Sequence, residues 1–212
     1  MDFTRKARQF TNAPFSRQLM LEMLKEYKRP NDKISELIKA GLLISLKKGL
    51  YIPGANAELP GPHPFLIANH LYGPSYVSLE SALSYWELIP ERVYEISSVT
   101  LKASKTYKTP KGRFSYQHIP SPYYSFGLRS VELQPNQVAL LASPEKALCD
   151  KIVTTSGISL RSSRQVMDFL LDDLRIDYDK LKKLDKKVIL SWADDAPKSN
   201  SIHMLVKALK AL

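Results

Sequence analysis

Basic side chains near the start of the chain are the residues whose types and spacing most clearly indicate a chemistry, the binding of phosphate groups. Residues 1–50 contain 11 Lys and Arg against 5 Asp and Glu, a net charge of +6 out of +10 for the 212-residue chain. Such a concentration is typical of a nucleic-acid contact surface, with simple solubility as the other explanation. The residues that we expect to contact DNA are Lys28, Arg29, Lys33, Ser35, Lys39, Lys47 and Lys48.

Groups that usually perform catalysis or hold metals are scattered. The histidines at positions 63, 70, 118 and 203 have no partner at metal-ligand spacing, and Cys149 is the single cysteine. The chain contains no GxSxG, HExxH or CxxC motif and no glycine-rich phosphate loop. We therefore predict no catalytic residue, no cofactor and no metal site, and we expect that the protein is not an enzyme.

Three carboxylates leave one enzymatic alternative open. Glu80, Glu145 and Asp150 could be metal ligands of an enzyme acting on nucleic acid, if the fold brought them together. A metal-dependent nuclease typically has an acid two positions before a lysine, and among the tripeptides that start at a glutamate only Glu26-Tyr27-Lys28 has that spacing. That tripeptide is expected on a surface helix, so we favour for Glu145 a role in starting a helix.

Aromatic and basic residues alternate between positions 102 and 126, which could form a base-stacking platform for single strands. The favoured interpretation is that the aromatics fill the core of a sheet while the basic residues decorate a solvated hairpin. The residues concerned are Lys102, Lys105, Tyr107, Lys108, Lys111, Arg113, Phe114, Tyr116, Tyr123, Tyr124 and Phe126.

The expected DNA contacts are positioned by residues 31–53. Asn31 is suited to cap a helix, Ile34, Leu37 and Ile38 give that helix one apolar stripe, and Gly41 ends it. Residues 42–44 and 50–52 then read as two strands joined by the basic turn 47–49. A helix followed by a hairpin with a basic tip is the second half of a winged helix-turn-helix, whose helix can enter the major groove.

The preceding residues supply the other helices of such a domain. Phe3, Ala7 and Phe10 have the spacing of a short helix, and Ser16 is a plausible cap for a helix over 17–27. Residues 54–64 hold three prolines and two glycines and are the best candidate linker. We therefore predict a winged-helix domain over 1–55 and a second domain over 65–212.

The second domain is predicted to combine a small, mainly antiparallel sheet with helices, which makes the whole chain an α+β protein. Ser143 and Pro144 mark one helix start with particular clarity. The expected strands are 93–101, 113–119, 124–128, 131–133 and 138–142. The expected helices are 65–72, 78–86, one from 144, 163–174, 178–184, 187–193 and 201–212.

Nothing in the sequence indicates a membrane or a secretory route. No apolar run approaches the ~20 residues that a membrane span needs, and MDFTRKARQF lacks the apolar core of a signal peptide. We expect a cytoplasmic protein that does not contact a membrane.

Four segments together resemble a known family. They are Lys48–Pro53, Tyr76–Leu83 (YVSLESAL), Gly112–Tyr116 and Ala142–Asp150 (ASPEKALCD). In this order they are similar to the AbiEi-type antitoxins and related transcriptional regulators of type IV toxin–antitoxin systems, over roughly 34–152. The resemblance implies a winged helix that binds and represses the operon's own promoter DNA. It also implies a C-terminal domain that counteracts a cognate nucleotidyltransferase-like toxin, without requiring a stable complex.

The helix over 31–39 departs from the arginine-rich pattern common in that family. Asp32 and Glu36 share its outward face with Ser35 and Lys39, and acids there repel phosphates. The wing and the Lys28-Arg29 flank are therefore expected to hold DNA more firmly than the helix. The acidic face also leaves open a second alternative, an interaction module whose winged helix binds protein.

Overall fold

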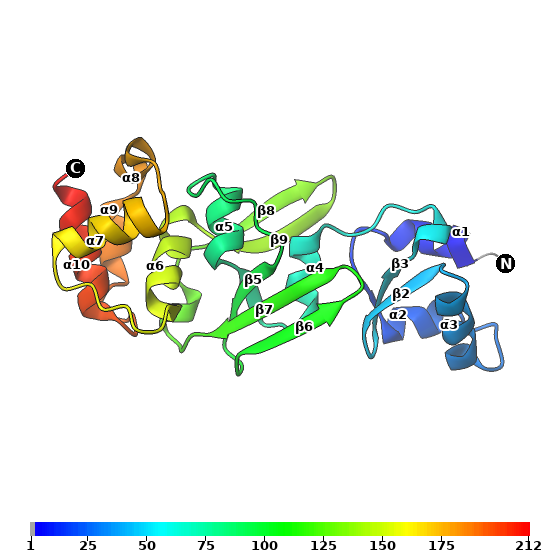
Figure 1. The fold of residues 1–212 in the computed structure, drawn as a ribbon. Helices are drawn as coiled ribbons and strands as arrows, with labels where there is room; N and C mark the ends of the chain where they lie inside the picture. The colour runs from blue at the N-terminus through cyan, green and yellow to red at the C-terminus, as the bar shows by residue number, and fades with distance from the viewer. Residues whose placement is uncertain (1–2) are drawn as a thin grey trace.

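Helices and a three-stranded sheet form the N-terminal end of the molecule in a computed structural model, which describes residues 3–212 (Figure 1). The elements are α1 Phe3–Ala7, the 3-10 helix Arg8–Phe10, β1 Phe15–Ser16, α2 Arg17–Met23, α3 Pro30–Lys39, β2 Leu43–Lys47 and β3 Leu50–Pro53. The sheet is antiparallel with the order β1-β3-β2. This succession of helix, strand, two helices and a hairpin is a winged helix-turn-helix, as predicted. Met1 and Asp2 of the predicted domain lie outside the described residues.

The ends of these helices follow from local chemistry. The Ser16 hydroxyl accepts the Leu19 N–H at 3.1 Å and caps α2, as expected. Gly41 adopts φ +69°, the left-handed conformation that ends α3. The predicted cap at Asn31 is wrong: α3 begins at Pro30, whose fixed φ suits the first helical position, and Asn31 lies inside the first turn. The helix α2 also ends at Met23, four residues before the predicted end.

A six-stranded sheet forms the middle of the molecule. Its elements are α4 Pro64–Leu71, β4 Ser75–Val77, α5 Leu79–Tyr85, β5 Ile96–Thr100, β6 Lys105–Thr109, β7 Gly112–His118, the 3-10 helix Tyr123–Ser125, β8 Leu128–Gln134, β9 Gln137–Ala142 and α6 Pro144–Thr154. The strand order is β6-β7-β5-β4-β9-β8. The pairs β5–β7 and β4–β9 are parallel and the other three are antiparallel, so the sheet is mixed.

The prediction missed two strands of this sheet and placed one wrongly. The strands β4 and β6 were not predicted. The three residues of β4 are too few to show the two-residue alternation of a strand, and the β6 sequence KTYKT looks like a solvated turn. The predicted strand over 124–128 is wrong, because the chain turns as a 3-10 helix at Tyr123–Ser125. The Ser125 hydroxyl donates to the Pro122 carbonyl oxygen at 2.7 Å and closes that turn.

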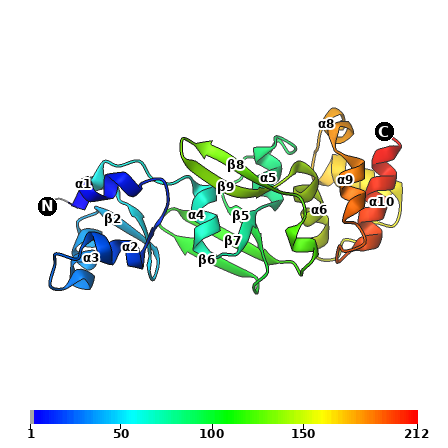
Figure 2. The ribbon, with the colours of Figure 1, turned by 180° about the vertical axis from the view of Figure 1, so that it is seen from behind.

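Both faces of the sheet are covered, by different elements (Figure 2). Alternation along the strands sends Tyr76 and Ala142 into one apolar core, whereas Val77 and Leu141 enter the other. The first core is shared with α5, α6 and the C-terminal helices. The second is shared with α4 and the wing. One face of the sheet is therefore covered by helices, and the other by α4 together with the wing hairpin.

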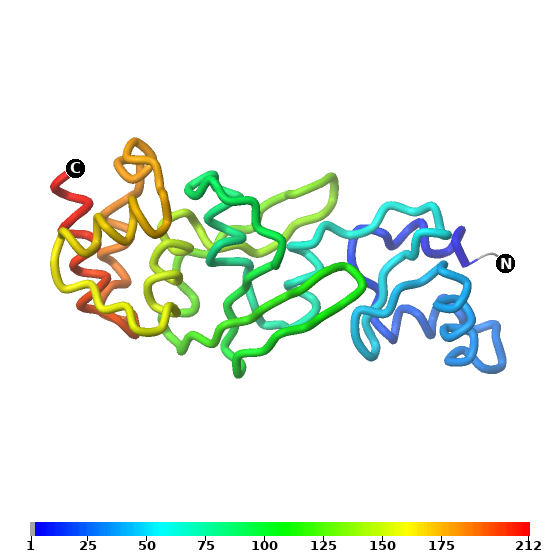
Figure 3. Tube along the Cα trace, in the orientation of Figure 1, coloured from blue at the N-terminus to red at the C-terminus, as the bar shows by residue number. Residues whose placement is uncertain are grey.

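The C-terminal end is helical, as predicted. Its elements are α7 Ser163–Asp168, continued by a π-helical stretch Phe169–Asp173, α8 Tyr178–Lys183, α9 Lys186–Ser191 and α10 Ser199–Lys210. Asp177 and Asp185 cap α8 and α9 through their side chains. The chain trace in Figure 3 runs from the winged helix to these helices, so the two termini lie at opposite ends of the elongated molecule. None of the helices within residues 3–212 is both long and apolar enough to cross a membrane.

The segment between the winged helix and the sheet is packed rather than extended. It contains a 3-10 helix, Ala55–Ala57, and Ala57 is buried. The Gly54 N–H donates to the Leu42 carbonyl oxygen at 3.0 Å, and the Asn56 side-chain amide donates to the Ala40 carbonyl oxygen at 2.8 Å. The start of the predicted linker therefore rests against the end of α3.

The wing is docked on the sheet domain. Its side chains Leu46, Leu50 and Ile52 are buried in the same core as residues of α4, β7 and β9, namely Leu66, Ile67, Leu71, Phe114 and Leu141. Only the tip of the hairpin, Lys48-Gly49, extends beyond the two strands. This docking decides which wing side chains a nucleic acid can reach.

Candidate nucleic-acid interface

Three of the residues predicted to contact DNA are exposed and have no side-chain partner within residues 3–212. Lys28 lies in the turn before α3, Lys39 in its last turn and Lys48 at the wing tip, and all three are exposed. None of them forms an ion pair or side-chain hydrogen bond with another residue of the range 3–212. Their ammonium groups are therefore available to phosphate oxygens.

Three other predicted DNA contacts, Lys33, Arg29 and Ser35, form ion pairs or hydrogen bonds within or beside α3. The Lys33 Nζ lies 2.7 Å from the Glu36 Oε2, and this hydrogen bond raises the pKa of Lys33. The Arg29 guanidinium is 3.8 Å from Asp32, and the Ser35 hydroxyl donates to the Asn31 carbonyl oxygen at 3.2 Å. The acids expected on this face thus pair with Arg29 and Lys33 but not with Lys39. Exposed pairs of this kind are weak, so a phosphate can compete for Lys33 and Arg29.

Lys47 faces away from the exposed wing tip. Its Nζ donates to the Leu71 carbonyl oxygen at the end of α4. Burial lowers the pKa of Lys47, and the charges of Lys102 and Lys105 lower it further. The structure therefore separates Lys47 from Lys48, although the two are adjacent in sequence.

Three arginines at the same end were not singled out from the sequence. Arg5, Arg8 and Arg17 are exposed on α1, on the 3-10 turn after it and on the first turn of α2. The Arg17 guanidinium lies 3.4 Å from the Asn31 side-chain oxygen and so borders the start of α3. The first helix of a helix-turn-helix crosses the DNA backbone, which makes Arg17 a natural addition to the interface. Only the charge count of residues 1–50 pointed to these arginines.

The three carboxylates considered as metal ligands of an enzyme, Glu80, Glu145 and Asp150, each interact with different partners. Glu80 pairs with Lys151, and Glu145 accepts the Ser143 hydroxyl at 2.9 Å and the Asp185 N–H at 3.2 Å. Asp150 pairs with Lys146 and accepts the hydroxyls of Tyr76 and Ser78. Among residues 3–212 no group of three His, Cys, Asp or Glu side chains is placed to hold a metal ion.

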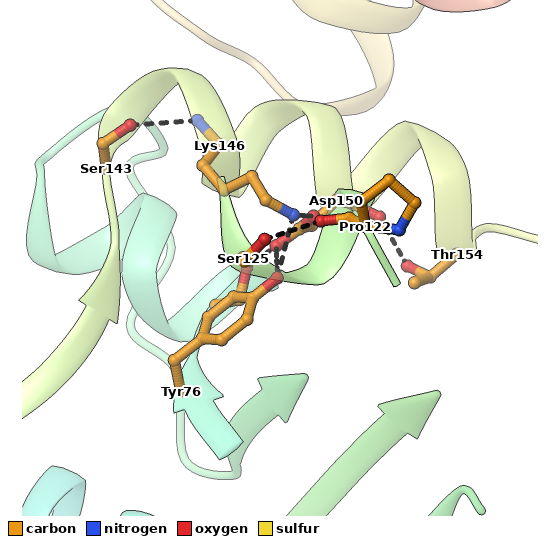
Figure 4. Close-up of polar contacts among 8 residues, drawn as sticks. Tyr76, Pro122, Ser125, Ser143, Lys146, Asp150 and Thr154 are labelled. Atoms are coloured by element: carbon orange, nitrogen blue, oxygen red, sulfur yellow. Dashed lines mark hydrogen bonds and ion pairs between the residues drawn. The ribbon is translucent and has the colours of Figure 1, made fainter. Parts of the chain in front are cut away.

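A buried polar cluster joins the two most distinctive sequence segments (Figure 4). The Lys146 ammonium pairs with Asp150 and donates to the Tyr76 hydroxyl at 2.8 Å. The hydroxyls of Tyr76 and Ser78 donate to Asp150 at 3.0 and 2.7 Å. Burial, and then the Asp150 charge, raise the pKa of Tyr76, which keeps its hydroxyl protonated. All four side chains are fully buried, so this cluster stabilises the contact between β4 and α6 and is closed to a substrate.

The aromatic residues of the hairpin region fill the core. Phe114, Tyr116 and Tyr123 are each at most 1% exposed, which leaves no ring face for a base. The favoured interpretation from the sequence is therefore confirmed for these three, and the stacking platform is not formed by them.

The fold is similar to that of a solved structure. The crystal structure of the RV2827C protein from Mycobacterium tuberculosis superimposes with a TM-score of 0.62 over 97% of this chain and 75% of that one. The two sequences are 16% identical, so the likeness concerns the fold alone. No protein-family model and no curated protein sequence matches this chain.

Proposed function

We propose that this protein is a DNA-binding antitoxin that represses its own promoter and counteracts a nucleotidyltransferase-like toxin, with no catalytic reaction of its own. The observation that supports DNA binding most directly is the winged helix with exposed, uncommitted Lys28, Lys39 and Lys48 around α3. The net charge of +6 over residues 1–50 favours the same partner. The antitoxin role rests on the resemblance of the segments around Tyr76 and Lys146 to AbiEi-type antitoxins.

DNA binding is tested with the double variant Lys39→Ala/Lys48→Ala. Its matched control is Lys207→Ala/Lys210→Ala, two exposed lysines on α10 at the opposite end of the molecule. The probe is a duplex from the region upstream of the gene, titrated at several salt concentrations. We expect the first variant to bind more weakly and to lower the salt slope by about two, because each phosphate contact contributes about 0.9. The control should behave as wild type, and equal effects of both variants would overturn the interface.

The antitoxin role is tested separately by co-expression with the nucleotidyltransferase-like toxin that the proposal expects a neighbouring gene to encode. The full-length chain should restore growth, and Lys39→Ala/Lys48→Ala should restore it equally while failing to repress a promoter reporter. Loss of rescue together with loss of repression would tie protection to DNA binding and contradict a separate antitoxin surface.

A protein-binding winged helix is the second candidate. Asp32 and Glu36 are exposed on the same face of α3, a surface that a basic partner could cover. Stable binding of the purified toxin, with no affinity for duplex DNA at low salt, would favour this candidate over the first.

A further inference from the structure

Three lysines from distant parts of the chain meet at the end of α4. Lys47 comes from the wing, Lys102 from the loop after β5 and Lys105 from the first position of β6. The ammonium groups of Lys47 and Lys102 donate to the carbonyl oxygens of Leu71 and Gly73. Those of Lys102 and Lys105 lie 5.3 and 5.7 Å from the centre of the Tyr72 ring.

The positive charge of this cluster is not balanced by the protein. The end of a helix presents roughly half a negative charge, against three full positive charges here. Within residues 3–212 none of the three lysines forms a salt bridge. Between Glu95 and Glu132 the sequence has six Lys and Arg and no Asp or Glu. An additional anion would therefore be favoured at this place.

The cluster is accessible to a large ligand. Lys102 and Lys105 are exposed, and Lys47 is half-buried. Tyr72 and Tyr107 pack on each other and on the buried Tyr116, and the ammonium groups of Lys102 and Lys105 lie over the Tyr72 ring, so these rings are not a free stacking surface. These features suit a charged, non-planar group such as a phosphate better than a base.

The position of the cluster indicates where that phosphate comes from. The strand β2, which carries Lys47, contacts β6, so the cluster lies beside the wing although Lys47 itself turns away from the exposed Lys48. The helix α3, the wing and β6 also lie toward the same edge of the molecule, the lower edge in Figure 1. A duplex held at α3 would extend its backbone toward this edge.

We propose that Lys47, Lys102 and Lys105 form a phosphate-binding site through which the sheet domain holds the backbone of DNA bound to the winged helix. The inference rests on the proposed DNA binding and adds a contact outside the winged helix. It makes the docked wing part of a continuous two-domain surface for nucleic acid. Lys102 and Lys105 would contribute affinity that is independent of base sequence.

The test uses the full chain and the variant Lys102→Gln/Lys105→Gln. The matched control is Lys108→Gln/Lys111→Gln on the same hairpin. The strand register places Lys108 on the sheet face opposite Lys105, and Lys111 lies in the turn. The probe is a 30-base-pair duplex of arbitrary sequence, since phosphate contacts are sequence-independent. We expect the first variant to lower the salt slope by about one to two and to weaken binding severalfold, with the control close to wild type.

Equal changes in the two variants would mean that any lysine of the hairpin contributes alike, and would overturn the site. If Lys39→Ala/Lys48→Ala weakens binding but Lys102→Gln/Lys105→Gln matches its control, the inference fails while the proposed function stands. If wild type binds no duplex, both fail. Inorganic phosphate, titrated while the lysine side chains are observed by NMR, decides the source of the anion. Millimolar phosphate that perturbs Lys102 and Lys105 when duplex DNA does not would overturn the DNA assignment.

Discussion

At residue scale, the chain places a lysine and an aspartate in its core. Lys146 and Asp150 are one helical turn apart on α6 and both are 0% exposed. Their charges are balanced by each other and by the hydroxyls of Tyr76 and Ser78, while the Lys146 Nζ lies 3.8 Å from the centre of the Tyr123 ring. An isolated charge at this depth would be very unfavourable, so each partner requires the other.

A double-mutant cycle measures this dependence. Lys146→Met and Asp150→Leu should each lower the free energy of unfolding by about 3–5 kcal/mol, because each leaves an unpaired charge in the core. The double variant should cost much less than the sum, since it removes both charges. Urea unfolding monitored by circular dichroism gives the three values. Additive costs would contradict a coupled pair.

His63 provides a second residue-scale prediction, on pH. Its Nδ1 accepts the Phe65 N–H at 3.2 Å and caps α4, and burial lowers the pKa of His63 below 6.5. Below about 6.5 the unfolded chain then binds more protons than the folded chain, so stability falls as the pH decreases. His63→Asn should keep the cap and flatten this part of the profile between pH 7.5 and 5. His118→Gln at the exposed end of β7 is the control, and a flattening of the same size there would refute the assignment.

The sequence predicted only part of this residue-scale chemistry. The start of α6 was predicted correctly, because the residue types of Ser143, Pro144 and Glu145 are those typical of a helix N-terminus. The burial of Lys146 and Asp150 was not predicted, because it depends on the hydroxyls of Tyr76 and Ser78, which lie some seventy positions earlier in the chain. Likewise Lys47 and Lys48 look equivalent as neighbours, and only the docking of the wing separates their surroundings.

At the scale of elements, those with local signals were predicted and those held by distant partners were not. The helix end at Gly41 and the cap at Ser16 depend on single residue types. The strand β4 has three residues and exists because β5 and β9 pair with it on either side. The strand β6 is rich in lysine and is stabilised by its register with β7. Pairing of this kind leaves no period in a short segment.

The glycines after the wing give a prediction at this scale. A Cβ at Gly54 would lie 2.1 Å from the Gly41 carbonyl oxygen, whereas a Cβ at Gly61 would meet nothing within 4 Å. Gly54→Ala should therefore force the end of α3 and the exit of β3 apart and lower stability by about 1–3 kcal/mol. Gly61→Ala should leave stability unchanged or slightly raised. Thermal unfolding of the two variants compares them directly, and similar melting temperatures would show that Gly54 is not a close contact.

At the scale of the whole molecule, the wing joins the two halves of the chain. Sequence composition predicted a linker over 54–64, and composition reports turns and breaks but not which surfaces meet. Leu46, Leu50 and Ile52 are 6%, 7% and 1% exposed in a core that they share with α4 and the central sheet. The winged helix is therefore expected to depend on the sheet domain for part of its stability.

A fragment of residues 1–62 tests this dependence. Without α4 and the sheet, the three wing side chains become exposed, and burying one such side chain is worth about 1.5–3 kcal/mol. We expect the fragment to unfold at a lower temperature than the full chain. Leu46→Gln separates the stability that comes from docking on the sheet domain from the stability of the winged helix itself. The substitution should lower the free energy of unfolding by about 2–4 kcal/mol in the full chain and by little in the fragment, where Leu46 already faces water. An equal cost in both would place Leu46 within the winged helix's own core. The wing would then be free to move toward DNA independently of the sheet, and the two-domain phosphate surface would lose its structural basis.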